Sequence, residues 1–162
     1  MARSSSPGCT ARTTLLLVGP HSWTSVPAAL VYDAADPYAV RVRFGEAAGA
    51  TAAVGTSDGG GPDDDGGVEW LLSRELLRTG LSCPAGEGDV RIWPARAGLD
   101  VLFLQLRAPS GEALFEVSTA AVGDFLRETE RLVPAGQESG LLHVDDELSA
   151  LLQRGGPDPT AL

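Results

Sequence analysis

The stretch YDAADPYAVRVRF, residues 32–44, decides how this chain begins to fold. Its second half alternates at every residue, so Tyr38 and the apolar residues at 40, 42 and 44 are expected on one face of a strand and the two arginines on the other. Its first half favours a turn, because Asp33 can bond the turn backbone and Pro37 fixes its own backbone angle. An apolar run lies just upstream, so the stretch predicts a half-buried β-hairpin.

Working outward from this hairpin, short apolar or alternating segments separated by turn residues recur along the chain. The segments with the composition of strands are residues 12–18, 26–32, 38–46, 68–72, 90–94, 99–107 and 112–117. They predict a sheet of about seven mostly antiparallel strands, since short turns join most of them. Residues 101–106 carry apolar groups on both faces, which predicts a central strand covered on both sides.

Helix start and stop signals follow the strands. Ser73 and Gly80 bound a short helix inserted after the fourth strand. Ser118 or Thr119 caps a second helix, and Asp145 caps a third with leucines on one side. The predicted fold class is therefore α+β: an antiparallel sheet with one short inserted helix and two C-terminal helices packed on it.

The length of 162 residues suits one domain, which we place at residues 10–154. Residues 47–67 are rich in Ala, Gly and Asp and predict a flexible insertion between strands. Their aspartates lack the ligand spacing and the closing Glu of a calcium loop, so a solvated acidic loop is expected there. Residues 1–9 and 155–162 are expected to be disordered ends.

The charge of the chain limits which partners it can bind, and its cysteines indicate the cellular compartment. The formal net charge is −10 and every one of the 12 basic residues is Arg, which disfavours binding to phosphate backbones. Cys9 and Cys83 fit no metal or redox spacing, so two free thiols in a reducing cytosol are expected. No segment approaches the roughly 20 apolar residues of a membrane span. The sequence therefore predicts a cytoplasmic protein without membrane insertion.

No catalytic constellation is visible. His21 and His143 are the only imidazoles, and neither lies in a motif of nucleophilic catalysis. Residues 143–147 include metal-ligating types, but a helix N-terminus favours acidic residues for capping and dipole reasons alone. The sequence predicts a protein that is not an enzyme, with no catalytic residue, no cofactor and no metal site.

A protein without catalytic residues acts through its surfaces, and the charged positions are the candidates. The candidate partner surface consists of Arg41, Arg43, Asp145, Asp146 and Glu147. An alternative function is single-stranded nucleic-acid binding, because paired arginines and aromatics on a sheet suit stacking and phosphate contact. Arg91 and Trp93 form a second such pair. Pairing of the arginines with the many carboxylates is the simpler interpretation.

Several segments of the chain resemble, in the same order, segments of a known family. They are residues 32–44, 68–70, 86–94, 111–114, 133–138 and 145–148. Together they resemble the SsgA-like family of sporulation and cell-division regulators from mycelial actinomycetes, from about Thr13 to Leu152.

The resemblance implies a non-enzymatic adaptor that helps recruit or activate the division machinery when hyphae are cut into spores, or that assists septal wall and spore maturation. It implies divisome partners such as the tubulin-like division GTPase or other family members, recruitment from the cytoplasm to the septum, and a homotrimer. It also implies that the antiparallel sheet is strongly bent, in a fold resembling the Whirly-type nucleic-acid binders.

Overall fold

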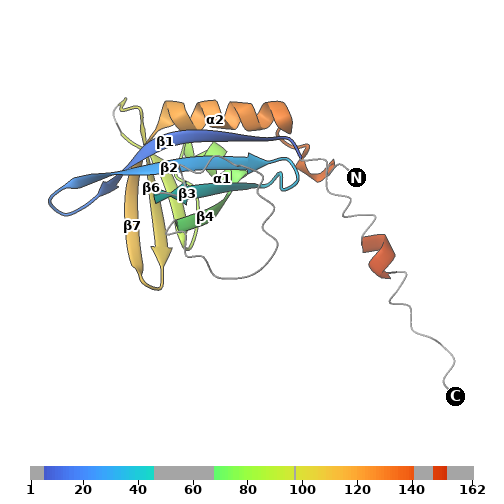
Figure 1. The fold of residues 1–162 in the computed structure, drawn as a ribbon, viewed down its shortest axis with the longest axis horizontal. Helices are drawn as coiled ribbons and strands as arrows, with labels where there is room; N and C mark the ends of the chain where they lie inside the picture. Colours follow the sequence, from blue (N-terminus) through green and yellow to red (C-terminus); the bar gives the residue numbers. More distant parts are fainter. Residues whose placement is uncertain (1–5, 46–67, 97, 141–147, 153–162) are drawn as a thin grey trace, which may run out of the picture.

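The computed structural model describes residues 6–45, 68–96, 98–140 and 148–152. The strands are β1 (Gly8–Val18), β2 (Trp23–Asp33), β3 (Ala39–Phe44), β4 (Val68–Ser73), β5 (Val90–Pro94), β6 (Val101–Ala108) and β7 (Gly111–Ser118). The helices are α1 (Arg74–Gly80), α2 (Thr119–Leu132) and the 3₁₀ turn η2 (Glu138–Gly140), and residues 148–152 are also helical. The strands form one curled antiparallel sheet in the order β4-β3-β2-β1-β7-β6-β5, with α2 along one side (Figure 1). The predicted α+β class is confirmed, but the prediction that the last helix packs on the sheet is wrong for its described residues, because Leu148, Leu151 and Leu152 are exposed.

The turn of the predicted hairpin forms as its residues require. The amide of Asp36 donates to the carbonyl of Asp33 at 3.0 Å, and the Asp33 side chain accepts from the amide of Ala35 at 2.8 Å. The buried Tyr32 hydroxyl donates to the Pro37 carbonyl at 3.0 Å, which pins the turn to the end of β2. Side-chain and backbone bonds of this kind are why Asp and Pro favour turns.

One residue of the hairpin departs from the expected alternation. Val40, Val42 and Phe44 are buried, but Tyr38 precedes β3 and its side chain is 49% exposed. Its carbonyl accepts the backbone N–H of Arg74 at 2.8 Å, so Tyr38 closes the start of α1 and does not continue the strand. The expectation that Tyr38 shares the buried face is wrong.

Strand β1 begins at Gly8, earlier than the expected start at 12. Its first residue pairs with Asp33, and the amide of Ala34 donates to the Pro7 carbonyl at 2.9 Å. Strands β1 and β2 approach so closely here that a Cβ on Gly8 would lie 2.6 Å from the Tyr32 carbonyl oxygen. This close approach explains why the position is a glycine. Two residues of the segment 1–9, expected to be disordered, therefore belong to the sheet.

Strand β6 has one fully covered face and not two. Leu102, Leu104 and Leu106 are buried on the inner side, whereas the opposite residues are only half-buried. On the outer side Phe103 stacks on Trp93 of the edge strand β5, with ring centroids 5.8 Å apart. The sheet curls around a single core, so the outer face of β6 is covered by neighbouring side chains alone.

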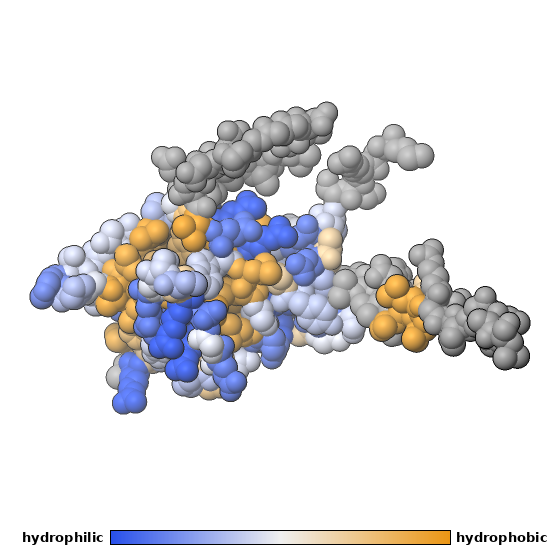
Figure 2. Space-filling model, turned by 90° about the horizontal axis from the view of Figure 1, so that it is seen from below, coloured by the Kyte–Doolittle hydropathy of each residue, from blue (hydrophilic) through white to orange (hydrophobic). Residues whose placement is uncertain are grey.

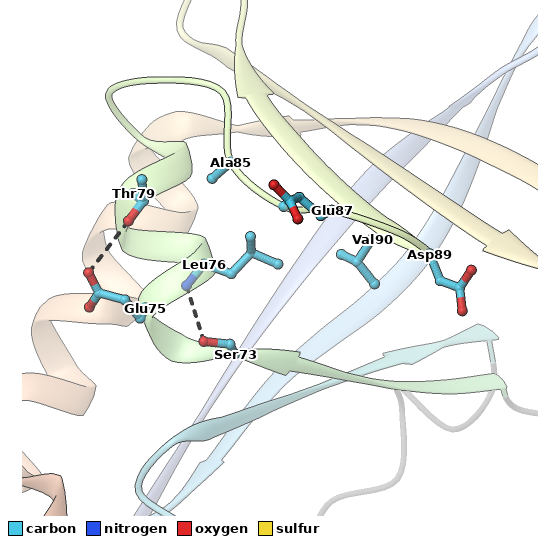
Figure 3. Close-up of a pocket in the computed structure, with 9 residues that line it drawn as sticks. Ser73, Glu75, Leu76, Thr79, Ala85, Glu87, Asp89 and Val90 are labelled. Carbon is cyan, nitrogen blue, oxygen red and sulfur yellow. Dashed lines mark hydrogen bonds between the residues drawn. The ribbon is translucent and has the colours of Figure 1, made fainter.

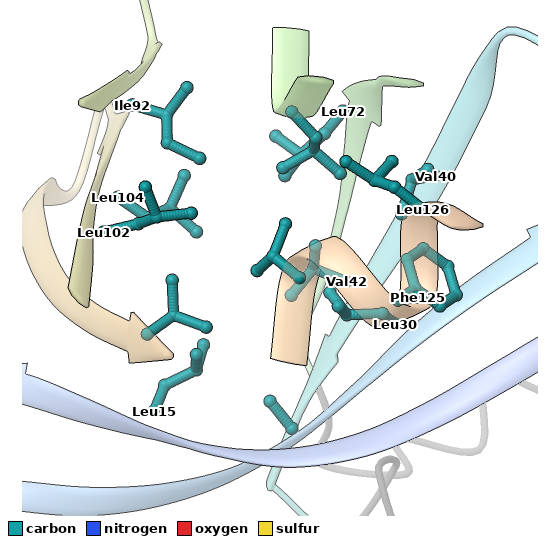
Figure 4. Packing of buried hydrophobic residues seen from close by; sticks show 14 of the residues in the cluster. Leu15, Leu30, Val40, Val42, Leu72, Ile92, Leu102, Leu104, Phe125 and Leu126 are labelled. Atoms are coloured by element: carbon teal, nitrogen blue, oxygen red, sulfur yellow. The ribbon is translucent and has the colours of Figure 1, made fainter. Parts of the chain in front are cut away.

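Helix α2 fills the inside of the curled sheet. Ser118 accepts the amide of Ala121 at 3.2 Å and caps the helix as predicted. Phe125 and Leu126 point into the cluster that holds the buried residues of the strands, such as Leu30 (Figure 4). The apolar stripe of α2 is thus the cover for the core, and its charged stripe faces outward.

Helix α1 lies between the two edges of the sheet. Its cap is the predicted one, because Ser73 accepts the amide of Leu76 at 3.3 Å. The helix contacts both edge strands and α2, and it ends against Ile92 of β5. A Cβ added at Gly80 would lie only 2.4 Å from the Ile92 Cγ2 atom, so the glycine permits this close packing.

The insertion 47–67, the tail 155–162 and the start of the third helix at Asp145 lie outside the described residues. The resemblance to Whirly-type proteins stays a prediction.

Candidate partner-binding surfaces

Arg41 and Arg43 lie on the outer face of the sheet, as predicted. Both are paired with Glu69 of β4, at 3.9 Å for Arg41 Nε and 2.7 Å for Arg43 Nε. Leu71, 61% exposed, lies opposite Arg41 in the register. Because one carboxylate serves both guanidinium groups, this face combines a screened ion-pair cluster with an exposed leucine.

The acidic part of the predicted surface cannot be placed beside these arginines. Asp145, Asp146 and Glu147 lie outside the described residues. That the five predicted positions form one partner surface therefore stays a prediction.

A second outer face is formed by β5, β6 and β7. Here the Arg107 Nε atom donates to Glu112 at 2.9 Å, and the Gln105 amide also donates to that carboxylate. The Gln105 bond, followed by that of Arg107, lowers the pKa of Glu112 below its ordinary value. Arg91 is exposed next to the stacked Trp93 ring. As on β3, polar partners offset much of the positive charge that nucleic-acid binding would need.

An apolar groove was not foreseen from the sequence. It has a volume of about 440 Å³ and lies where the ends of β3 and β4 face those of β6 and β7. Phe44 and Phe115 stack in it with ring centroids 5.1 Å apart, next to Trp70 and to Val68, whose side chain is 57% exposed. Figure 2, seen from the side opposite α2, shows hydrophobic side chains gathered between charged ones. We refer to this site as the apolar groove.

A second groove of about 520 Å³ runs between α1 and the loop that leads into β5 (Figure 3). Leu76, Val90, Glu87 and Asp89 are among its lining residues, and Glu75, also at its edge, turns its carboxylate toward Thr79 and pairs with Arg78. Within the described ranges, no three His, Cys, Asp or Glu side chains are placed to hold a metal ion. This groove is an acidic surface feature.

Arg74 is buried, with 1% of its surface exposed, at the junction of β4 and α1. Its guanidinium donates to the carbonyls of Val133 at 2.7 Å and Thr129 at 3.3 Å, and to the Glu138 carboxylate at 2.5 Å. The Arg74 hydrogen bond is the main cause of a lowered pKa for Glu138. Arg74 also lies over the Tyr32 ring, 5.2 Å from its centroid. This cation ties the end of α2 to the start of α1.

The other side chains singled out from the sequence lie in different parts of the chain, and not all of them are described. His21 is exposed in the turn between β1 and β2, and His143 lies outside the described residues. Cys9 and Cys83 are both unpaired, and burial raises the pKa of the Cys9 thiol. No helix among the described residues has the length and apolar character needed to cross a membrane.

Comparison with known proteins decides the family. The profile described as "Streptomyces sporulation and cell division protein, SsgA" matches residues 26–138, from β2 to η2. The chain belongs to the SsgA family. This confirms the resemblance and places the function of the protein in cell division during sporulation.

Relatives within the SsgA family cover nearly the whole chain. Sporulation-specific cell division protein SsgB of Streptomyces coelicolor is 41% identical over 138 residues, which are 85% of this chain and 89% of that protein. The SsgB protein of Salinispora tropica is 44% identical over 144 residues, or 86% and 90% of the two chains.

Solved SsgA-family structures share the fold at a TM-score of 0.69 and 36% identity. One was reported with mutations in SsgB that correlate with longitudinal cell division during sporulation of Streptomyces coelicolor, and it covers 87% of this chain and all of its own. The other is an SsgA-like sporulation-specific cell division protein from Thermobifida fusca, which covers 93% of this chain and 99% of its own. The comparisons do not favour the alternative of single-stranded nucleic-acid binding.

Proposed function

We propose that this SsgA-family protein is a non-enzymatic adaptor that brings division proteins together at the septum when hyphae divide into spores. The observation that carries the proposal is the similarity to SsgB of Streptomyces coelicolor, a protein named for sporulation-specific cell division. The alignment covers 89% of that protein at 41% identity. The fold is shared over the same extent, so the adaptor role rests on a common scaffold and not on an isolated motif.

The apolar groove supports an adaptor role on physical grounds. Aromatic side chains are enriched at the centres of protein interfaces, where their burial supplies much of the binding free energy. Trp70 and the largely buried Phe44 and Phe115 supply such groups for contacts between copies of the chain, and the outer face around Arg41 and Arg43 is the surface that we propose for the division partners. Our proposal for the partners is the tubulin-like division GTPase or other family members. We also propose a cytoplasmic protein that forms a homotrimer and is recruited to the septum.

Localisation and co-purification test this proposal. A fluorescent fusion of the full chain in sporulating hyphae of its host should appear at the sites of future septa, and the tagged protein should retain division proteins. A diffuse signal throughout septation, together with no division protein retained, would contradict an adaptor role. The fusion should first be shown to support normal spore formation, so that a diffuse signal is interpretable.

A further inference from the structure

Two apolar surfaces stand out among the residues that the structure describes. One is the apolar groove. The other is a stripe of leucines on the helical residues 148–152, where Leu148, Leu151 and Leu152 are 50%, 66% and 76% exposed. Residues spaced by three and four positions lie on the same face of a helix, so the three side chains form one continuous stripe.

The leucine stripe has the chemical character that the apolar groove would bind. The groove is lined by Trp70 and by the stacked Phe44 and Phe115, which are only 8% and 7% exposed, and its rim is open at Val68. An amphipathic helix that lays an apolar face into a hydrophobic groove is a recurrent mode of protein recognition, with anchors spaced as these leucines are. In Figure 1 the helical residues 148–152 lie apart from the sheet, on the side of the molecule where the N-terminus lies.

The insertion that joins β3 to β4 is a poor occupant of the groove. It connects Phe44 and Val68, which both line the groove, but its residues 46–67 include no apolar side chain larger than that of Val54. It therefore lacks the bulky apolar groups that a space of about 440 Å³ would bury.

The leucine stripe does not easily reach the groove of its own chain. Gly140 and Leu148 are eight residues apart, a span of about 28 Å at full extension. Gly140 lies at the Arg74 and Tyr32 end of the sheet, where Cys9 pairs with Tyr32. From Cys9 to Leu17, which lines the groove, β1 alone runs about 27 Å. The connection would be fully stretched before the path around the sheet is added.

We propose that the apolar groove of one copy binds the leucine stripe of residues 148–152 of a second copy. Each chain then provides one groove and one stripe, so the contact is heterologous, and it can repeat around a closed ring of copies such as the proposed homotrimer. This inference rests on the homotrimer proposed above and specifies the contact between its copies, which the division role does not. Burial of one leucine side chain is large enough that its replacement by aspartate should raise the dissociation constant of self-association at least about tenfold.

Sedimentation equilibrium of the full chain and four variants tests the contact. Leu151→Asp and Val68→Asp alter the stripe and the rim of the groove, and each should weaken self-association at least about tenfold. Leu99→Asp and Trp23→Asp are the controls, because these apolar residues are 66% and 58% exposed and lie outside both surfaces. The controls should stay within about twofold of wild type. A monomeric wild-type chain, or equal effects in all four variants, would overturn the proposal.

Cross-linking separates a second copy from the same chain. A photoreactive residue at position 152 is introduced into full-length protein, and ¹⁴N and ¹⁵N preparations are mixed before irradiation. Mixed-isotope cross-links from this position to the peptide that holds Val68 and Trp70 are expected. Cross-links within one isotope only, or to peptides outside the groove, would refute the contact between copies. Both tests use purified protein, whereas the division role is tested in hyphae, so the failure of one is distinct from the failure of the other.

Discussion

Replacement of Arg74 by methionine removes the buried cation that joins α2 to α1. The methionine keeps most of the apolar stem but removes the donor to the Val133 carbonyl and the Glu138 carboxylate, whereas the Thr129 carbonyl keeps the backbone N–H of Val133 at 2.9 Å. The Glu138 side chain is only 12% exposed, so water replaces the lost donor incompletely. The variant therefore places an uncompensated charge next to the end of a helix.

The magnitude follows from these contacts. A hydrogen bond to a charged group contributes about 1.5–3 kcal/mol net, and removal of one partner from a buried ion pair costs about 3–5 kcal/mol. We expect Arg74→Met to lower the free energy of unfolding by about 3–5 kcal/mol. A domain of this kind has about 5–15 kcal/mol in total, so the variant should still fold but with a marginal reserve.

Equilibrium unfolding in urea measures this loss. The matched control is Arg127→Met, because Arg127 is also paired with an acidic residue on α2 but its side chain is 67% exposed. That exposed pair should contribute at most about 0.5 kcal/mol. A loss below about 1 kcal/mol for Arg74→Met, or equal losses in the two variants, would refute the assignment of a structural ion pair to Arg74.

Three other changes test separate parts of the fold. Gly80→Ala should lower the unfolding free energy by about 1–3 kcal/mol, since its Cβ would meet Ile92, whereas Gly123→Ala, with open space around it, should raise it by about 0.5–1 kcal/mol; urea midpoints check both signs. Glu138→Gln should flatten the acid limb of the stability curve: the lowered pKa of Glu138 stabilises the folded state above its unfolded value of about 4.3 and loses this effect as the pH falls through the folded pKa. A wild-type slope in this variant would contradict that role. Ser118→Ala should remove the cap of α2 and cost about 1 kcal/mol in thermal unfolding, and an unchanged midpoint would argue against the cap.

Local features of the chain could be predicted from its sequence. The caps Ser73 and Ser118 act on amides three residues away, so their signal is contained in a few neighbouring letters. The alternation that buries Val40 and Val42 is equally local. Tyr38 breaks the pattern because its carbonyl is used by α1, an element that comes 36 positions later in the chain.

Features that depend on how the sheet curls could not be predicted. The groove brings Phe44 next to Phe115, and no spacing in the sequence indicates that these strands face one another. Arg74 follows a helix cap, where an arginine is ordinarily exposed, and only the return of α2 buries it. The outer face of β6 stays half-buried for the same reason, because α2 covers only the inner side.

The most direct test of the account is septation in a strain that lacks the gene. Hyphae of the deletion strain should form few or misplaced sporulation septa, and the full chain supplied in trans should restore them. Septa are counted by membrane and wall staining during sporulation, beside the parent strain. Normal septation and normal spores in the deletion strain would contradict the proposed adaptor role.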